Sequence, residues 1–140
     1  MINASKVFKV LLDQDTDGIV AEVGTRISSP VLQSDYDFET RPKAIRFRQL
    51  GTSEHNDTKL LEMSFEVMSF ASSQTKAQEI ARAVDDWLLD DARTNQIIAA
   101  ENTRIVWIMS ESRGEDLPPA DIPKLYATRT AYRIAFANNP

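Results

Sequence analysis

The segment Asp13-Gln14-Asp15-Thr16-Asp17-Gly18 has the most suggestive spacing of acidic side chains in this sequence. Alternate carboxylates followed by a turn glycine match the first half of a calcium-binding loop, where they converge on a hard cation. The second half does not match, because the bidentate glutamate belongs at the position of Gly24 and the nearest acid is Glu22. Aspartate and glycine are also the usual residues of a turn that ends a helix. The pattern therefore favours a turn, with a small calcium-binding interaction module as the alternative.

Other residues that catalyse reactions or bind metals are scarce. The chain has no cysteine and one histidine, His55, which lies in a polar segment. Thiolate and histidine metal clusters are therefore excluded. The chain has neither a Gly-x-Ser-x-Gly motif nor a glycine-rich phosphate loop. Adjacent carboxylates occur, but no pattern isolates one of them in an apolar pocket, as a general acid requires. The sequence thus predicts a protein that is not an enzyme and that needs no cofactor.

The length and charge set further limits. The 140 residues are most simply one domain, spanning residues 1–140. The net charge is -5, with 21 acidic and 16 basic residues, which disfavours general binding to a phosphate backbone. No apolar run approaches about 18 residues, and the N-terminus lacks the apolar core of a signal peptide. We therefore expect a soluble protein that is made in a cytoplasm and does not bind a membrane.

The clearest structural signal is a change of hydrophobic period from 2 to 3.6. Residues 61–67 alternate apolar and polar side chains, which is typical of a half-buried strand. Residues 77–88 then carry an apolar stripe at helical spacing. Thr75 and Gln78 fit a capping box for this helix, and Ser72 or Ser73 can cap it one turn earlier. The pattern predicts a strand followed by a helix that packs on the strand's own sheet.

The remaining elements suggest an α+β fold. They begin with a first helix from Asn3 or Ser5 to about Leu12, a second short helical turn at residues 19–23 and a short strand at residues 26–27. A hairpin of strands 43–50 and 59–70 around a polar loop, a central strand 103–109, a proline-rich loop 111–124 and a last strand 126–137 follow. We predict one mainly antiparallel sheet of four to five strands with two main helices packed on one face. A protruding β-hairpin and long loops complete this prediction.

Two features indicate a protein–protein interface. The connection 28–41 is long and carries Tyr36 and Phe38, so a partner-contacting arm is favoured over a solvated linker. The outer face of the predicted sheet carries outward-alternating arginines and glutamates, which either pair across strands on a wet face or meet the next copy of the protein. The candidate interface residues are Tyr36, Phe38, Arg46, Arg48, His55, Met68, Phe70, Arg129 and Arg133.

Met68 and Phe70 break the alternation of their strand. They fall on the same face as Glu62 and Glu66, where polar residues are expected. Either a β-bulge resets the phase near Val67, or another chain covers this part of the face.

The order and spacing of four motifs resemble those of a known family. Val23-Gly24-Thr25-Arg26-Ile27 follows the first helix, and Pro42 opens the hairpin strand. Phe70-Ala71-Ser72 separates the alternating strand from the main helix, and Leu125-Tyr126 begins the closing strand. In this combination the chain resembles the tail terminator, or tail completion, proteins of long-tailed bacteriophages. The resemblance covers most of the chain.

The resemblance implies a structural protein of the virion, assembled in the host cytoplasm. Such proteins form a ring, typically a hexamer, that caps the head-proximal end of the tail tube and stops its polymerisation. The implied partners are further copies of the chain, the tail tube protein and the head connector or neck proteins. Phage DNA would pass through the lumen without specific binding, which suits an acidic chain. Another neck or head–tail connector protein is the alternative, since sequence patterning does not separate the two.

Overall fold

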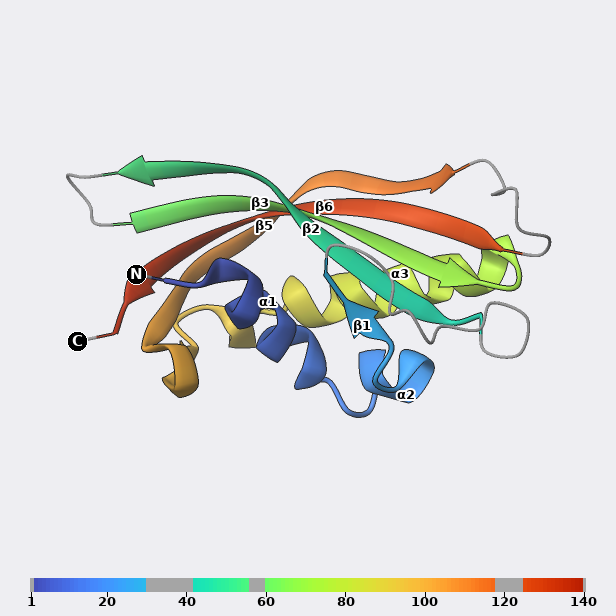
Figure 1. Cartoon of the computed structure of the whole chain (residues 1–140), viewed down its shortest axis with the longest axis horizontal. Coiled ribbons are helices and arrows are strands. Elements are labelled where there is room, and N and C mark those ends of the chain that lie inside the picture. Colours follow the sequence, from blue (N-terminus) through green and yellow to red (C-terminus); the bar gives the residue numbers. More distant parts are fainter. Residues whose placement is uncertain (1, 30–41, 56–59, 118–124, 140) are drawn as a thin grey trace.

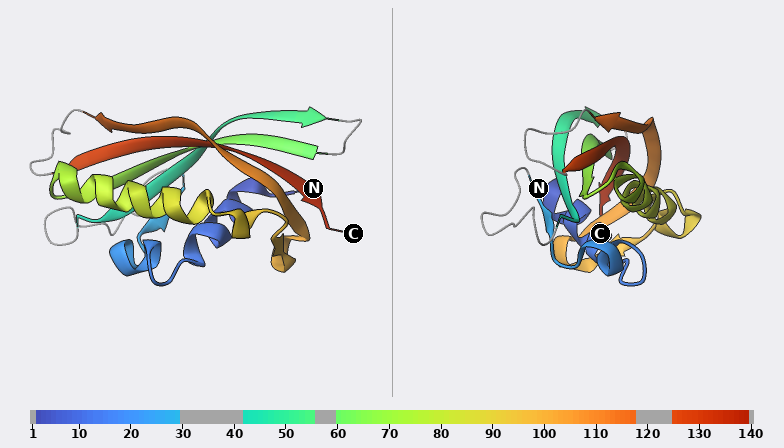
Figure 2. Two further views of the ribbon diagram at one scale, coloured as in Figure 1. Left: turned by 180° about the vertical axis from the view of Figure 1, so that it is seen from behind. Right: turned by 90° about the vertical axis from the view of Figure 1, so that its right-hand side faces the viewer.

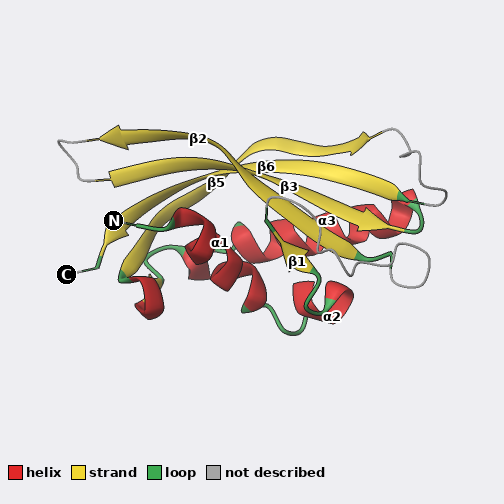
Figure 3. Ribbon diagram, viewed as in Figure 1, coloured by secondary structure: helices red, strands yellow, loops and turns green. Residues whose placement is uncertain are grey.

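The computed structural model describes residues 2–29, 42–55, 60–117 and 125–139, so the predicted interface residues Tyr36 and Phe38 lie outside the described residues. One sheet and the helices on one of its faces form the described part of the chain (Figures 1 and 3). The long strands are β2 (Ala44–His55), β3 (Leu60–Ala71), β5 (Thr103–Leu117) and β6 (Tyr126–Asn138), and the short ones are β1 (Ile27–Ser28) and β4 (Ile97–Ile98).

The sheet has six strands in the order β1-β2-β3-β6-β5-β4, and only the β1–β2 pair is parallel. The α+β class and the mainly antiparallel sheet are confirmed. The predicted count of four to five strands is wrong. The short strand expected at residues 26–27 corresponds to β1, but β4 was missed because its two residues are too short to produce a period in the sequence. β5 was predicted to be central, yet β3 and β6 occupy the middle of the sheet.

The helices are α1 (Ala4–Asp13), α2 (Ile19–Val23) and α3 (Gln74–Leu88), with 3-10 turns η1 (Asp91–Arg93) and η2 (Ala99–Glu101). Asn3 caps α1, since its Oδ1 accepts a hydrogen bond from the amide of Lys6 at 3.1 Å. Ser73 caps α3 by accepting from the amide of Lys76 at 3.2 Å. The capping box of Thr75 and Gln78 is therefore wrong, because the helix begins one residue before Thr75.

The hydrophobic core lies between the helices and the sheet, and both views in Figure 2 show α3 running along that face. Phe8 of α1 stacks on Phe65 of β3 with ring centroids 4.3 Å apart. Trp87 of α3 donates its indole N–H to the carbonyl oxygen of Leu11 at 2.7 Å, which joins α3 to α1. Each large apolar side chain buried here contributes about 1.5–3 kcal/mol before the cost of ordering it.

The long strands extend further than their apolar patterns. β2 continues through residues 51–55, which were predicted as loop, and β5 continues to Leu117 through the predicted loop at 111–117. A register shift between Gln49 and Gly51 marks a β-bulge at Leu50, and β5 has three register shifts along β6. Antiparallel pairing satisfies backbone groups whatever the side chains, so polar residues extend these ladders without contributing to the core.

Candidate interaction face

The face of the sheet opposite the helices, here called the helix-free face, carries most of the predicted interface residues. Phe65 and Val67 of β3 point into the core, so their neighbours along the strand point to the other side. The predicted residues on this face are Arg46 and Arg48 of β2, Met68 and Phe70 of β3, and Arg129 and Arg133 of β6. His55 is the last residue of β2, and its side chain lies outside the described ones.

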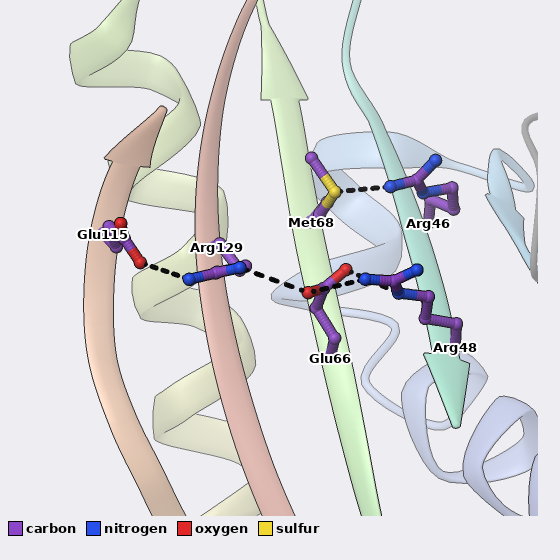
Figure 4. Close-up of polar contacts among 6 residues, drawn as sticks. All are labelled: Arg46, Arg48, Glu66, Met68, Glu115 and Arg129. Carbon is purple, nitrogen blue, oxygen red and sulfur yellow. Dashed lines mark hydrogen bonds and ion pairs between the residues drawn. The ribbon is translucent and has the colours of Figure 1, made fainter. Parts of the chain in front are cut away.

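A chain of ion pairs crosses four strands on this face (Figure 4). Nε of Arg48 donates to Oε1 of Glu66 at 2.9 Å, and Nη2 of the same guanidinium donates to Oε2 at 3.3 Å. Nη1 of Arg129 lies 3.5 Å from Oε2 of Glu66, and its Nη2 donates to Oε2 of Glu115 at 2.5 Å. The charges therefore alternate in sign from β2 through β3 and β6 to β5.

Glu66 is the least exposed member of this chain of ion pairs. Its side chain is 5% exposed, whereas the Arg48 and Arg129 side chains are 51% and 41% exposed. The hydrogen bond to Glu115, and then the charge of Glu115, raise the pKa of Arg129 above its ordinary value. A carboxylate covered by two guanidiniums keeps strong charge-assisted hydrogen bonds, so it holds β2 and β6 on either side of β3.

Two further arginines lie on the same face with different partners. Nε of Arg133 is 3.2 Å from Oε2 of Glu62. Nη2 of Arg46 contacts Sδ of Met68 at 2.6 Å, and within the described residues no carboxylate lies at ion-pair distance from Arg46 (Figure 4). A thioether is only a weak acceptor, so Arg46 is the arginine of this face whose charge is not compensated by those residues.

The apolar part of the face is mostly covered by the chain itself. Phe70 is 8% exposed and clusters with Leu125 and Ala127, and Met68 and Leu117 pack against this cluster. The β3–β6 register runs without a shift from Leu61 to Ala71, so the bulge suggested within β3 is wrong. The phase is unbroken, and residues of the same chain cover Phe70.

Three residues on or beside this face were not predicted. Leu50 and Met109 are 50% and 49% exposed, and Glu115 ends the chain of ion pairs. Leu50 follows Arg46 and Arg48 in the same alternation, so its outward position was readable from the sequence. Met109 and Glu115 were not, because the register shifts of β5 change which face its residues occupy.

The aspartates of the calcium-like motif are used locally. Nζ of Lys9 lies 2.7 Å from Oδ2 of Asp13, one helical turn away. Oδ2 of Asp15 accepts a hydrogen bond from the amide of Ile19 at 2.9 Å, at the start of α2. Among the residues that the structure describes, no three histidine, cysteine, aspartate or glutamate side chains gather to hold a metal ion.

A shallow polar pocket of about 250 Å³ lies between α3 and the ends of β5 and β6. Its polar groups bond one another: Gln78 Nε2 donates to Asp116 Oδ2 at 2.8 Å, and Thr128 Oγ1 donates to Asp116 Oδ1 at 3.1 Å. The buried hydroxyl of Tyr132 donates to Asp85, and burial raises the pKa of Tyr132. These contacts fix α3 on the sheet.

The sequence matches no protein-family profile and no curated protein. The fold does match a solved structure, titled virion of native gene transfer agent (GTA) particle, with a TM-score of 0.68 and 14% identity. The match covers 91% of this chain and 90% of that chain. This chain therefore shares its fold with a chain of that virion. No helix in the described part of the chain is long and apolar enough to cross a bilayer.

Proposed function

We propose that this protein is a structural component of a phage-like virion, and that it is a tail terminator. In this role it forms a ring, caps the head-proximal end of the tail tube, stops tube polymerisation and offers a surface for head joining, without catalysis. The observation that carries the proposal is the fold shared with a chain of a GTA virion over nine-tenths of both chains. The order of sequence motifs that resembles the tail terminators supports the finer assignment.

The shape of the sheet suits a closed ring. Within the described residues, helices cover one face of the sheet and not the other (Figure 1). The two outer strands, β1 and β4, differ from each other, so the two edges of the sheet are not equivalent. A heterologous contact, in which one patch binds a different patch on the neighbour, produces a ring when the rotation closes. The proposed partners are therefore further copies of this chain, six in the closed ring as the family resemblance implies, together with the tail tube protein and the head connector.

The charges of the helix-free face agree with DNA passing such a ring without being held. Arg48 and Arg129 are paired with Glu66, and Arg133 is paired with Glu62. Binding to a phosphate backbone requires basic side chains that gain by replacing counterions. Three of the four arginines named on this face therefore offer little such gain, on a chain of net charge -5, and Arg46 is the exception.

The first experiment is size-exclusion chromatography with light scattering, followed by negative-stain microscopy of the purified protein. We expect a closed ring with a central hole. A protein that stays monomeric at high concentration would contradict the proposal.

A second experiment separates the terminator from another neck protein. The rings are mixed with isolated tail tubes and, separately, with tailless heads of the particle that encodes the chain. A terminator is expected to decorate one end of each tube and to arrest further growth when free tube protein is added. Rings that bind heads and leave tube growth unchanged would indicate a head–tail connector instead.

A further inference from the structure

The two long edges of the sheet point to a specific mode of self-association. We propose that the open side of β2 in one copy pairs with the open side of β5 in a second copy, which gives one antiparallel sheet that continues across the subunit boundary. This inference rests on the ring assembly proposed above and names the surfaces that build it.

Within the described residues, both edges leave backbone groups unpaired over most of their length. β1 pairs only with Ile45 and Arg46 of β2, and β4 pairs only with Thr103 and Arg104 of β5. No strand in the described ranges pairs with the outer side of residues 47–55 or 107–117. Just before the second of these stretches, Ile105 forms backbone hydrogen bonds with Asn95 and Gln96. An open strand edge is a template for pairing with another chain.

The strand directions favour a head-to-tail contact. The four long strands β2, β3, β6 and β5 are each antiparallel to the next, so β2 and β5 run in opposite directions. A second copy in the same orientation therefore places its β5 antiparallel to β2 of the first. Every copy then offers one edge of each kind, so the contact repeats around a ring.

Residues that lie opposite one another in neighbouring strands form rows across the sheet. Each row runs from β2 through β3 and β6 to β5. The first row is Arg46, Met68, Arg129 and Glu115. The second row is Arg48, Glu66, Ala131 and Ser112. The third row is Gly51, Ser64, Arg133 and Met109, with Leu50 as the bulged residue beside Gly51.

The ends of these rows complement each other. If the rows continue into the second copy, Arg46 lies opposite Glu115 of that copy, and Leu50 lies near its Met109. Arg46 is the arginine of the helix-free face without a carboxylate among the described residues, and the Glu115 side chain is 57% exposed. Leu50 and Met109 are both half exposed, so the contact removes apolar surface from water.

Charge also argues against the symmetric alternative. A symmetric antiparallel pairing of β2 with β2 of a second copy, centred on Phe47, would place Arg46 opposite Arg48 of the partner strand. Like charges directly opposite each other in a sheet are destabilising, whereas opposite charges stabilise the pair. The complementary ends therefore favour β2 with β5 over β2 with β2.

Because the chain has no cysteine, engineered disulfides test this contact cleanly. Single-cysteine variants are made on a long-tagged and a short-tagged chain, mixed, and oxidised mildly. The matched mixtures Leu50→Cys with Met109→Cys and Arg46→Cys with Glu115→Cys are expected to give a dimer containing both tags. The swapped mixtures, Leu50→Cys with Glu115→Cys and Arg46→Cys with Met109→Cys, are expected to lose it. Lys76→Cys on the exposed side of α3, mixed with Met109→Cys, is the control for random collision.

Each outcome decides the proposal. Dimers in the matched mixtures alone support it. Dimers from Leu50→Cys chains alone would show a symmetric β2 contact, and stronger linkage in the swapped mixtures would refute the row assignment. Rings of the unmodified protein without linkage in any mixture would overturn the edge contact and leave the ring intact. A monomeric unmodified protein would instead contradict the proposed function.

Discussion

The carboxylate of Glu66 receives both Nε and Nη2 of Arg48, at 2.9 and 3.3 Å, across the β2–β3 pair. The same carboxylate lies 3.5 Å from Arg129 on the next strand. One buried carboxylate is therefore the ion-pair partner of two arginines on the helix-free face. This relationship makes Glu66 the residue whose removal changes the face most.

Glu66→Gln is expected to lower the free energy of unfolding by about 1–3 kcal/mol, because hydrogen bonds to a charged acceptor are replaced by weaker ones. Urea denaturation followed by circular dichroism measures this change. Asp13→Asn is the control, since its side chain is 45% exposed, pairs with Lys9 and lies away from the proposed subunit contact. Exposed pairs contribute little, so a control that loses as much stability as Glu66→Gln would contradict this account.

Tyr132 is expected to make the free energy of unfolding fall as the pH rises above about 10. Burial raises its folded-state pKa above the unfolded value of about 10, so the folded state keeps a proton that the unfolded state releases. Its contribution to stability is fully present below about pH 10 and is lost as the pH rises further. The slope from this group approaches about 1.4 kcal/mol per pH unit.

Urea denaturation between pH 9 and 11 measures that slope, and Tyr132→Phe removes the titrating group. We expect the variant to be less stable at neutral pH, because the hydrogen bond to Asp85 is lost, and to show a shallower decline above pH 10. Parallel curves for the two proteins would refute the assignment to Tyr132.

Gln49→Pro is expected to abolish ring assembly while the monomer stays folded. The amide of Ile45 donates to the carbonyl of Arg26 on the β1 side, and backbone direction alternates along a strand. The amide of Gln49 thus points to the open edge, where proline removes a donor without touching the β3 ladder. Light scattering measures the assembly, and circular dichroism checks the fold.

Arg48→Pro is the matched control for Gln49→Pro, since its amide faces β3 and its loss is expected to unfold the sheet. Gln49→Thr keeps the amide and is expected to keep the ring. A Gln49→Pro protein that still forms rings would show that this edge is not a subunit contact.

Substitutions of Asp15 test whether its carboxylate supports the start of α2 or binds calcium. Asp15→Ala is expected to cost about 1 kcal/mol, because the amide of Ile19 loses its acceptor, whereas Asp15→Asn keeps an acceptor oxygen and costs less. Thermal unfolding with and without millimolar calcium completes the test. A calcium-dependent rise in the melting temperature that Asp15→Asn abolishes would revive the binding-module interpretation.

Local sequence patterns predicted which side chains of a single strand or helix face the core and which face away from it. The alternation in residues 61–67 placed Glu66 opposite to Phe65 and Val67, and the apolar stripe of α3 marked its buried residues. The outward arginines Arg46 and Arg48 followed from the same alternation. By contrast, the strand content of residues 51–55 and 111–117 was missed, because long backbone ladders extend there without an apolar signal.

By itself the sequence determined the period, and hence the faces, of the main strands and helices, since side-chain direction repeats every 2 or 3.6 residues within one element. Only the tertiary structure decided the strand order, the bulge at Leu50, the phase of β5 and the burial of Glu66 between Arg48 and Arg129. These features arise from pairing between segments far apart in the chain, and the local period carries no information about which strands become neighbours or which edges stay open.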